Sequence, residues 1–195
     1  MRLLLLKLVA TAGVTALLAL PFVDADARAG VLASVARIGV PALVVSVAVF
    51  LAAVASYCRS LQTCLERIRP EARAASPRSV WLMFLIPYNF IEDFFIVRNV
   101  AVSLRAEAAV NPVLGRLRGF GTVSGLGWCT AQIISLVPNR VGEAAGAVAL
   151  VLWIVHWRFL ARVNELLTPD PNQARSETKL HLFHTELTES AESTE

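Results

Sequence analysis

Two adjacent carboxylates, Glu92 and Asp93, are the side chains in this sequence best placed to do chemistry. They lie in residues 80–107, a segment otherwise rich in apolar and aromatic residues. Charge in such surroundings is costly unless it faces protein, water or a polar interface. Two further residues, Asn89 and Arg98, complete a candidate functional polar site. A site of this composition could bind a cation or relay protons.

A structural role is the alternative for these acids, and we expect it ahead of ion binding. Carboxylates beside a broken helix can be solvated at the level of lipid headgroups or paired with an arginine. Arg98 follows Asp93 by five positions and Glu92 by six, and both spacings are poor for a pair on one helix. A partner from another segment, such as Arg78 or Arg158, is therefore expected.

Other reactive side chains form no pattern typical of an enzyme. Ser124 and His156 are expected at similar depth, but the sequence has no HExxH, GxSxG or phosphate-loop motif. Cys58, Cys64 and Cys129 lack metal-ligand spacing, and we expect the first two to be reduced, cytoplasmic thiols open to a membrane-permeant maleimide. These observations predict a non-enzymatic protein without catalytic residues, cofactor or metal site.

Composition predicts the setting in which these residues must be held. The 195 residues are 56% hydrophobic with a mean hydropathy of +0.60, which is typical of an integral membrane protein. Apolar runs near the length of a spanning helix predict four transmembrane helices, over residues 3–23, 38–57, 120–138 and 144–162. We expect an all-α fold with one membrane domain, residues 1–167, and retention of the first run as a signal anchor.

The arginine distribution predicts the topology. Basic residues favour the cytoplasmic side, so both termini are expected there. The apolar stretch Val80–Ile86 has seven residues and is followed by Pro87, which removes a backbone donor, so this stretch is too short to cross. We therefore expect residues 80–107 to form a broken helix that re-enters or lies amphipathically at the interface. A fifth span is the alternative.

Small residues and the C-terminal tail complete the prediction. Gly121 with Gly125, and Gly142 with Gly146, have the small-xxx-small spacing that lets helix backbones approach closely. Residues 168–195 are expected to form a polar, acidic cytoplasmic tail.

Short motifs spread over residues 40–167 resemble a family of bacterial multi-pass membrane proteins. Phe84–Phe90 has the sequence FLIPYNF, Arg98–Glu107 is RNVAVSLRAE, Gly125–Cys129 is GLGWC and Leu150–Ala161 is LVLWIVHWRFLA. The family is of unknown function, and some members carry an N-terminal GYF-type domain. The resemblance implies a location in the bacterial cytoplasmic membrane and implies no activity. The chain departs from the family pattern at Glu92-Asp93 and at His156.

Two functions remain open from the sequence. The first is an accessory or scaffold subunit of a larger membrane complex, with membrane lipids and other membrane-protein subunits as partners. The second is a small transporter or channel component that uses Glu92 and Asp93 at the broken helix. Nucleic acid is not an expected partner, because the basic residues flank the membrane runs. A water-filled cavity that is enclosed by the four helices and reaches Glu92 would favour the second function, whereas carboxylates at the lipid headgroups would favour the first.

Overall fold

Every regular element in the described part of this computed structural model, residues 1–117 and 119–168, is a helix. The long helices are α1 (Arg2–Val23), α3 (Val40–Arg67) and α7 (Arg140–Leu166), and the intermediate ones are α2 (Ala25–Ile38), α4 (Asn89–Ala108) and α6 (Thr122–Ile134). The short elements are α5 (Pro112–Gly115) and two 3-10 helices, η1 (Pro70–Ala72) and η2 (Pro77–Phe84). The predicted all-α class is confirmed.

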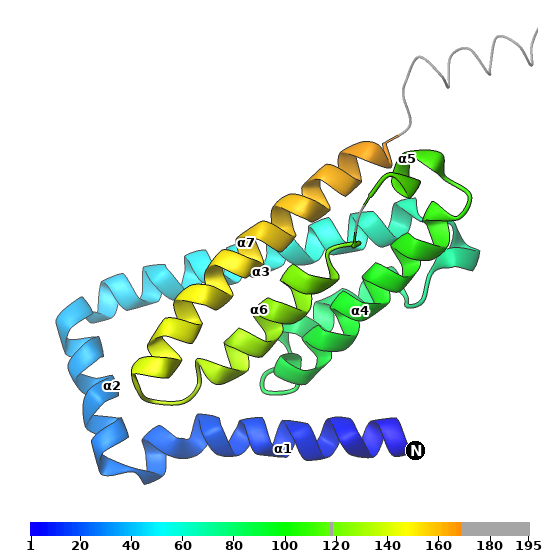
Figure 1. Cartoon of the computed structure of the whole chain (residues 1–195). Helices are drawn as coiled ribbons and strands as arrows, with labels where there is room; N and C mark the ends of the chain where they lie inside the picture. Colours follow the sequence, from blue (N-terminus) through cyan, green and yellow to red (C-terminus); the bar gives the residue numbers. More distant parts are fainter. Residues whose placement is uncertain (118, 169–195) are drawn as a thin grey trace, which may run out of the picture.

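Polar and glycine residues separate these helices as their conformational preferences require. The Asp24 side chain accepts a hydrogen bond from the Asp26 backbone N–H and begins α2. Gly39, with φ of 82°, lies between α2 and α3, in a region that favours glycine. Asn139 accepts a hydrogen bond from the Gly142 backbone N–H and begins α7. In Figure 1, α2 links α1 to α3 at one end of the molecule.

Three helices in the described residues are long and apolar enough to cross a membrane: α1, α3 and α7. They overlap the predicted spans at 3–23, 38–57 and 144–162. The predicted span at 120–138 contains α6, whose 13 helical residues extend about 20 Å. That is shorter than a hydrocarbon core of about 30 Å. The fourth crossing therefore stays a prediction.

The segment from η2 to α4 is a hairpin that returns to its starting end. Trp81 Nε1 donates to Gln62 Oε1 at 2.6 Å, while Met83 lies farther back along α3, 3.6 Å from the Cys58 thiol. The chain turns at Pro87, and α4 then runs beside α6 and α3 toward the end that holds α5 (Figure 1). The predicted break at Pro87 therefore lies between η2 and α4, and re-entry of this segment into a membrane stays a prediction.

α4 lies inside the bundle, which differs from the amphipathic surface helix that was the other prediction for this segment. It contacts α1, α3, α6 and η2. Its buried residues are distributed over several faces, from Asn89 through Ile96 and Val100 to Glu107. The difference arises because the side chains that look polar in the sequence, among them Glu92, Asp93 and Glu107, find partners or a cavity within the protein.

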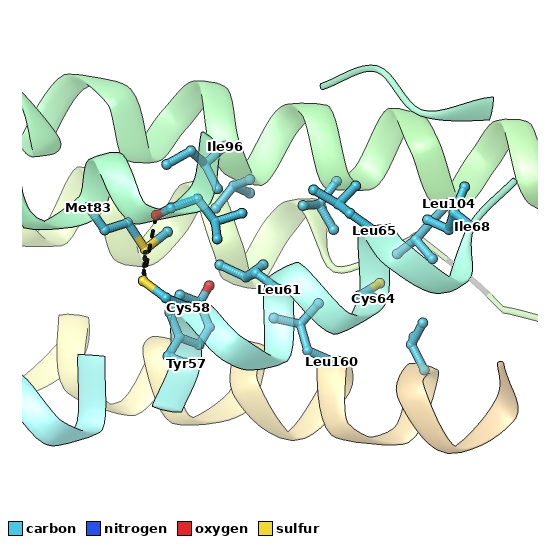
Figure 2. Packing of buried hydrophobic residues seen from close by; sticks show 14 of the residues in the cluster. Tyr57, Cys58, Leu61, Cys64, Leu65, Ile68, Met83, Ile96, Leu104 and Leu160 are labelled. Atoms are coloured by element: carbon cyan, nitrogen blue, oxygen red, sulfur yellow. Dashed lines mark hydrogen bonds between the residues drawn. The ribbon is translucent and has the colours of Figure 1, made fainter. Parts of the chain in front are cut away.

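The tightest hydrophobic core occupies one half of the bundle. Figure 2 shows Leu61, Leu65, Leu104 and Leu160 packed together between α3, α4 and α7. In the other half, apolar side chains point outward, and Phe50 of α3 is 56% exposed. One half of the molecule is therefore built like a water-soluble bundle, and the other has an apolar outer surface.

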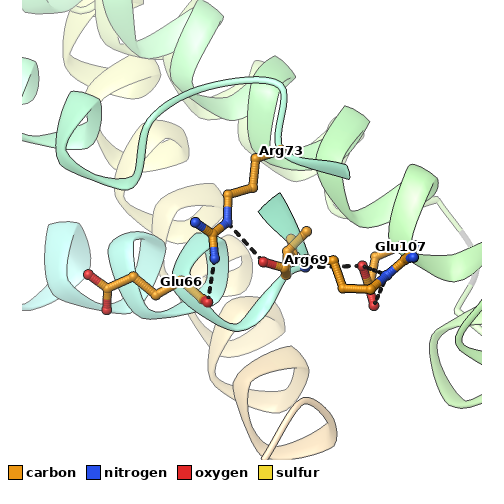
Figure 3. A network of polar contacts seen from close by, with 5 residues as sticks. Glu66, Arg69, Arg73 and Glu107 are labelled. Atoms are coloured by element: carbon orange, nitrogen blue, oxygen red, sulfur yellow. Dashed lines mark hydrogen bonds and ion pairs between the residues drawn. The ribbon is translucent and has the colours of Figure 1, made fainter. Parts of the chain in front are cut away.

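Polar contacts fasten the loop at the core end of the bundle. Arg69 Nε pairs with Glu107 Oε2 at 3.1 Å, and Arg73 donates to the backbone carbonyls of Ile68 and Glu66, each at 2.8 Å (Figure 3). These bonds tie the loop after α3 to the last turn of α4.

The three cysteines are free thiols, and all are fully buried. Cys58 points at Met83 and the Val80 carbonyl (Figure 2). The expectation that Cys58 and Cys64 are free thiols is confirmed, and their reaction with a permeant maleimide stays a prediction, which their burial makes slow. A thiol without solvent contact is protected by packing, whichever side of a membrane it occupies.

Candidate ligand-binding cavity

The four residues predicted as a polar site all belong to α4, but they do not converge. Asn89, Glu92 and Asp93 are buried, with 9%, 7% and 2% of their surface exposed. Arg98, in contrast, is exposed. One helical turn separates Asn89 from the acids, which brings the three buried side chains to neighbouring positions on the helix.

Glu92 pairs with Lys7 of α1, a partner that the sequence reasoning missed. Lys7 Nζ lies 2.5 Å from Glu92 Oε2, and the two side chains are 14% and 9% exposed. The same ammonium group lies 4.1 Å from the centroid of the Phe95 ring and 5.8 Å from that of Tyr88, in a cation–π arrangement. Lys7 interrupts an otherwise uncharged run. A lone charge in a spanning segment usually faces protein. The isolated position of Lys7 in the sequence could therefore have indicated a buried partner.

Asp93 is the most buried acid, and it has no such partner. Its Oδ1 atom is buried without a hydrogen bond. Burial in an apolar site, with the negative charge of Glu92 as a smaller cause, raises the pKa of Asp93 well above its usual range. Its carboxyl interacts electrostatically with Tyr57 and Cys58 of α3 and with Cys129 of α6. Asp93 therefore faces the centre of the bundle.

A half-open cavity of about 430 Å³ lies where Asp93 points. Its lining includes four residues that each carry a buried polar atom without a hydrogen bond in the structure. These atoms are Tyr57 Oη, Asn89 Oδ1, Asp93 Oδ1 and Trp128 Nε1. Buried polar groups are nearly always paired. Four unpaired ones around a single cavity indicate a site that a ligand or water completes.

Aromatic rings form one wall of this cavity. Phe50, Trp153, Tyr57 and Trp128 follow one another, with successive ring centroids 6.2, 5.6 and 6.2 Å apart. The pairs of Tyr57 with Trp153 and with Trp128 are edge-to-face, at interplanar angles of 71° and 86°. The wall comes from α3, α6 and α7, and α4 adds Asn89 and Asp93 to the lining, so the cavity combines aromatic rings with polar groups.

The rim of the cavity is apolar and exposed. Phe50, Ile86 and Leu150 line it and are 56%, 66% and 53% exposed, whereas Tyr57 and Asp93 at its floor are 1% and 2% exposed. The opening therefore belongs to the half of the molecule that has an apolar outer surface.

Gly121 and Gly125 allow α6 to approach α7 and α4 closely. A Cβ atom at Gly125 would lie 2.4 Å from Val97 Cγ1 and 2.9 Å from the His156 ring. One at Gly121 would lie 2.7 Å from the Phe159 ring. Both positions of this small-xxx-small pair are thus close-contact sites, and they hold α6 where Trp128 can reach the cavity.

The second glycine pair is split between two environments. A Cβ atom at Gly142 would lie 1.9 Å from the Val137 backbone oxygen, inside the turn between α6 and α7. At Gly146, which lines the cavity, the nearest atom would be Ser135 Cβ at an ordinary 3.6 Å. Gly142 is therefore required by the turn, and Gly146 borders the ligand space.

Ser124 and His156 lie together but outside the cavity lining. Ser124 Oγ is 3.2 Å from His156 Nδ1 and 3.2 Å from the Gly121 carbonyl oxygen. His156 Nε2 is buried without a hydrogen bond, so among the described residues no carboxylate orients the ring as in a catalytic triad. The contact ties α6 to α7.

Comparisons with known proteins identify no relative: no family model, no curated protein and no solved structure matches the chain. The resemblance to a bacterial membrane family therefore stays a prediction, and the function must be argued from the cavity and its surroundings. The predicted tail, residues 168–195, lies outside the described residues apart from Thr168.

Proposed function

We propose that this chain is a non-enzymatic integral membrane protein that binds a small, membrane-dissolved molecule in the cavity at Asp93. The observation that carries the proposal is the set of four unpaired buried polar atoms around one cavity of about 430 Å³. Ligand sites are concave and mostly apolar, with a few convergent polar groups, and their volumes are commonly about 300–1,000 Å³.

The distribution of charge supports the membrane setting. α3 carries no charged residue from Val40 to Cys58, a length of about 28 Å. α7 carries none from Ala144 to Trp157, about 21 Å. The arginines that follow, Arg59 and Arg158, are exposed and mark a common boundary. We propose that this boundary is the cytoplasmic face of the bacterial inner membrane, with α1, α3, α6 and α7 as the four crossings.

The topology has a direct test. A periplasm-active reporter fused at Arg28, after α1, should be active, and the same reporter fused after Thr168 should be silent. The reason is that α1, α3, α6 and α7 give an even number of crossings while the η2–α4 hairpin adds none. Western blotting of both fusions controls for expression. Strong activity after Thr168 would mean that an odd number of segments cross.

Binding without chemistry fits an accessory subunit of a larger membrane complex. α1 packs mainly against α2 and α4, and most of its apolar side chains, including Leu4 and Leu8, are exposed. These faces would meet lipid or another membrane-protein subunit. Transport is the second candidate, and the observation that favours it is that Asp93 and Ile86, the residue before the break at Pro87, line the same half-open cavity. Release of a bound ligand to the opposite side of a proteoliposome would favour transport over binding.

Ligand binding is tested on the intact protein in lipid nanodiscs. Native mass spectrometry of the wild type should reveal a bound small molecule of a few hundred daltons, and occupancy should fall at least about tenfold in Asp93→Asn and Trp128→Phe. Asp93→Asn removes the ionisable acid at nearly constant shape, and Trp128→Phe removes the indole N–H donor while it keeps an aromatic ring. Glu143→Gln, at an exposed site at the start of α7, is the matched control and should keep wild-type occupancy. Wild-type occupancy in both Asp93→Asn and Trp128→Phe would refute the cavity as the site.

A further inference from the structure

The buried acids of this protein differ in whether a basic side chain pairs with them. Glu92 has the Lys7 ammonium at 2.5 Å and Glu107 has the Arg69 guanidinium at 3.1 Å. Asp93 is more buried than either, and no described basic side chain pairs with it. A buried carboxylate needs a cation or a proton. Two of the acids take the cation from the chain itself, and the third faces the cavity.

We infer that the ligand is a lipophilic organic cation with a primary or secondary ammonium group, which enters from the bilayer and pairs with Asp93. This inference rests on the proposed function and names its ligand class. The ammonium hydrogens would be shared between Asp93 Oδ1 and Asn89 Oδ1, the two unpaired acceptors of the cavity.

The aromatic wall favours a cation over a neutral molecule of the same shape. Tyr57, Trp128 and Trp153 line the cavity, and the face of such a ring attracts a desolvated cation. A metal ion suits the donor set poorly, because Mg²⁺ and Ca²⁺ require about six or more oxygen ligands. The described residues hold no cluster of three His, Cys, Asp or Glu side chains that could supply them.

The route of entry follows from the rim. Phe50, Ile86 and Leu150 are exposed and lie within the charge-free lengths of the helices or at the hairpin turn. A molecule that partitions into the hydrocarbon can pass between these side chains. A hydrophilic cation in water would meet an apolar surface instead, so the site selects cations that carry a large apolar body.

Binding of the cation is expected to release a proton. Burial raises the pKa of Asp93 well above its usual range, which favours the protonated carboxyl. When an incoming ammonium ion pairs with the carboxylate, that proton passes to water. The other titratable groups around this carboxyl are Glu92 and its partner Lys7, Tyr57, Cys58 and Cys129, with His156 against the Tyr57 ring. Lys7 already holds Glu92, so Asp93 is the carboxyl left to exchange a proton for the ligand's cation.

The experiment uses three rigid probes that differ in their head group: adamantylamine, adamantanol and adamantane carboxylate. Binding to the intact protein in nanodiscs is measured by calorimetry at several pH values. We expect the amine to bind at least tenfold more tightly than the alcohol, and the carboxylate not to bind. The affinity for the amine should rise up to about tenfold per pH unit, with about one proton released. In Asp93→Asn the affinity for the amine should fall to the affinity for the alcohol and should no longer depend on pH.

The outcomes separate the two proposals. Equal binding of amine and alcohol by the wild type would overturn the cation inference while the cavity remained the binding site. A pH-independent affinity for the amine, or tight amine binding that survives in Asp93→Asn, would also overturn it. No binding of any probe, together with no co-purified molecule in the wild type, would overturn the proposed function itself. Glu143→Gln should follow the wild type in every measurement, which controls for the general effect of losing one negative charge.

Discussion

Replacing Lys7 by methionine is expected to lower the free energy of unfolding by about 3–5 kcal/mol, the usual cost of removing one partner from a buried ion pair. Lys7 and Glu92 are 14% and 9% exposed and lie 2.5 Å apart. Loss of the ammonium would leave the Glu92 carboxylate inside the protein without a cation. Glu92→Gln should cost a similar amount for the converse reason. Tryptophan fluorescence during denaturant titration of the protein in detergent micelles measures both changes.

The double variant shows whether the lost stability comes from an uncompensated charge or from the substitution of the two side chains themselves. Lys7→Met combined with Glu92→Met removes both charges, and most of the lost stability should return, because apolar side chains can replace a buried pair at little cost. Arg69→Ala is the matched control at the other ion pair. There the arginine side chain is 50% exposed, so water can take part of the place of the lost guanidinium. The Arg69 backbone N–H also still donates to Glu107 Oε2 at 3.3 Å, so the loss of Arg69 should cost clearly less than the loss of Lys7. If Lys7→Met costs no more than Arg69→Ala, the pair contributes nothing beyond a surface contact, and α1 must be held in another way.

The long helices could be predicted because apolar character is a local property. Each of α1, α3 and α7 contains enough consecutive apolar residues to be recognised without its neighbours. The same count of apolar residues overestimated the length of the helix in the third run, 120–138. It registers Phe120 and the residues after Ile134 as apolar, although the helix begins after Gly121, with φ of 71°, and ends at Ile134. Hydropathy measures partitioning and carries no information about where a turn begins.

The candidate site could be predicted only in part, because it is built by contacts between segments that are distant in the sequence. The importance of Asn89, Glu92 and Asp93 was visible because polar groups in apolar surroundings are costly. The partner of Glu92 was not, since Lys7 is 85 residues away and no spacing rule connects two helices that remote. Tyr57 and Trp128 belong to α3 and α6 and look like ordinary core aromatics in the sequence. Only their packed positions place the unpaired Oη and Nε1 atoms on the same cavity as Asp93.

Gly142→Ala is expected to lower stability by about 3 kcal/mol or more, at the upper end of the cost of overpacking. The added Cβ atom would lie 1.9 Å from the Val137 carbonyl oxygen and 3.4 Å from that of Ile134. Both are backbone atoms, so no side-chain rotation relieves the contact, and the turn between α6 and α7 would have to open. The hydrogen bond from the Gly142 N–H to Asn139 Oδ1, at 3.0 Å, would be lost with it.

Gly146→Ala, one helical turn later on α7, provides the matched control. Its Cβ atom would meet Ser135 Cβ at 3.6 Å, an ordinary contact, and alanine favours the helix over glycine by up to about 1 kcal/mol. The variant should therefore be as stable as the wild type or more so in the same denaturant titration. Equal losses in both variants would mean that the interior of the helix, and not the turn, limits what these positions tolerate. A loss confined to Gly142→Ala would identify the turn as the feature that sets the register of α6 against α7 and, through α6, the position of Trp128 in the cavity.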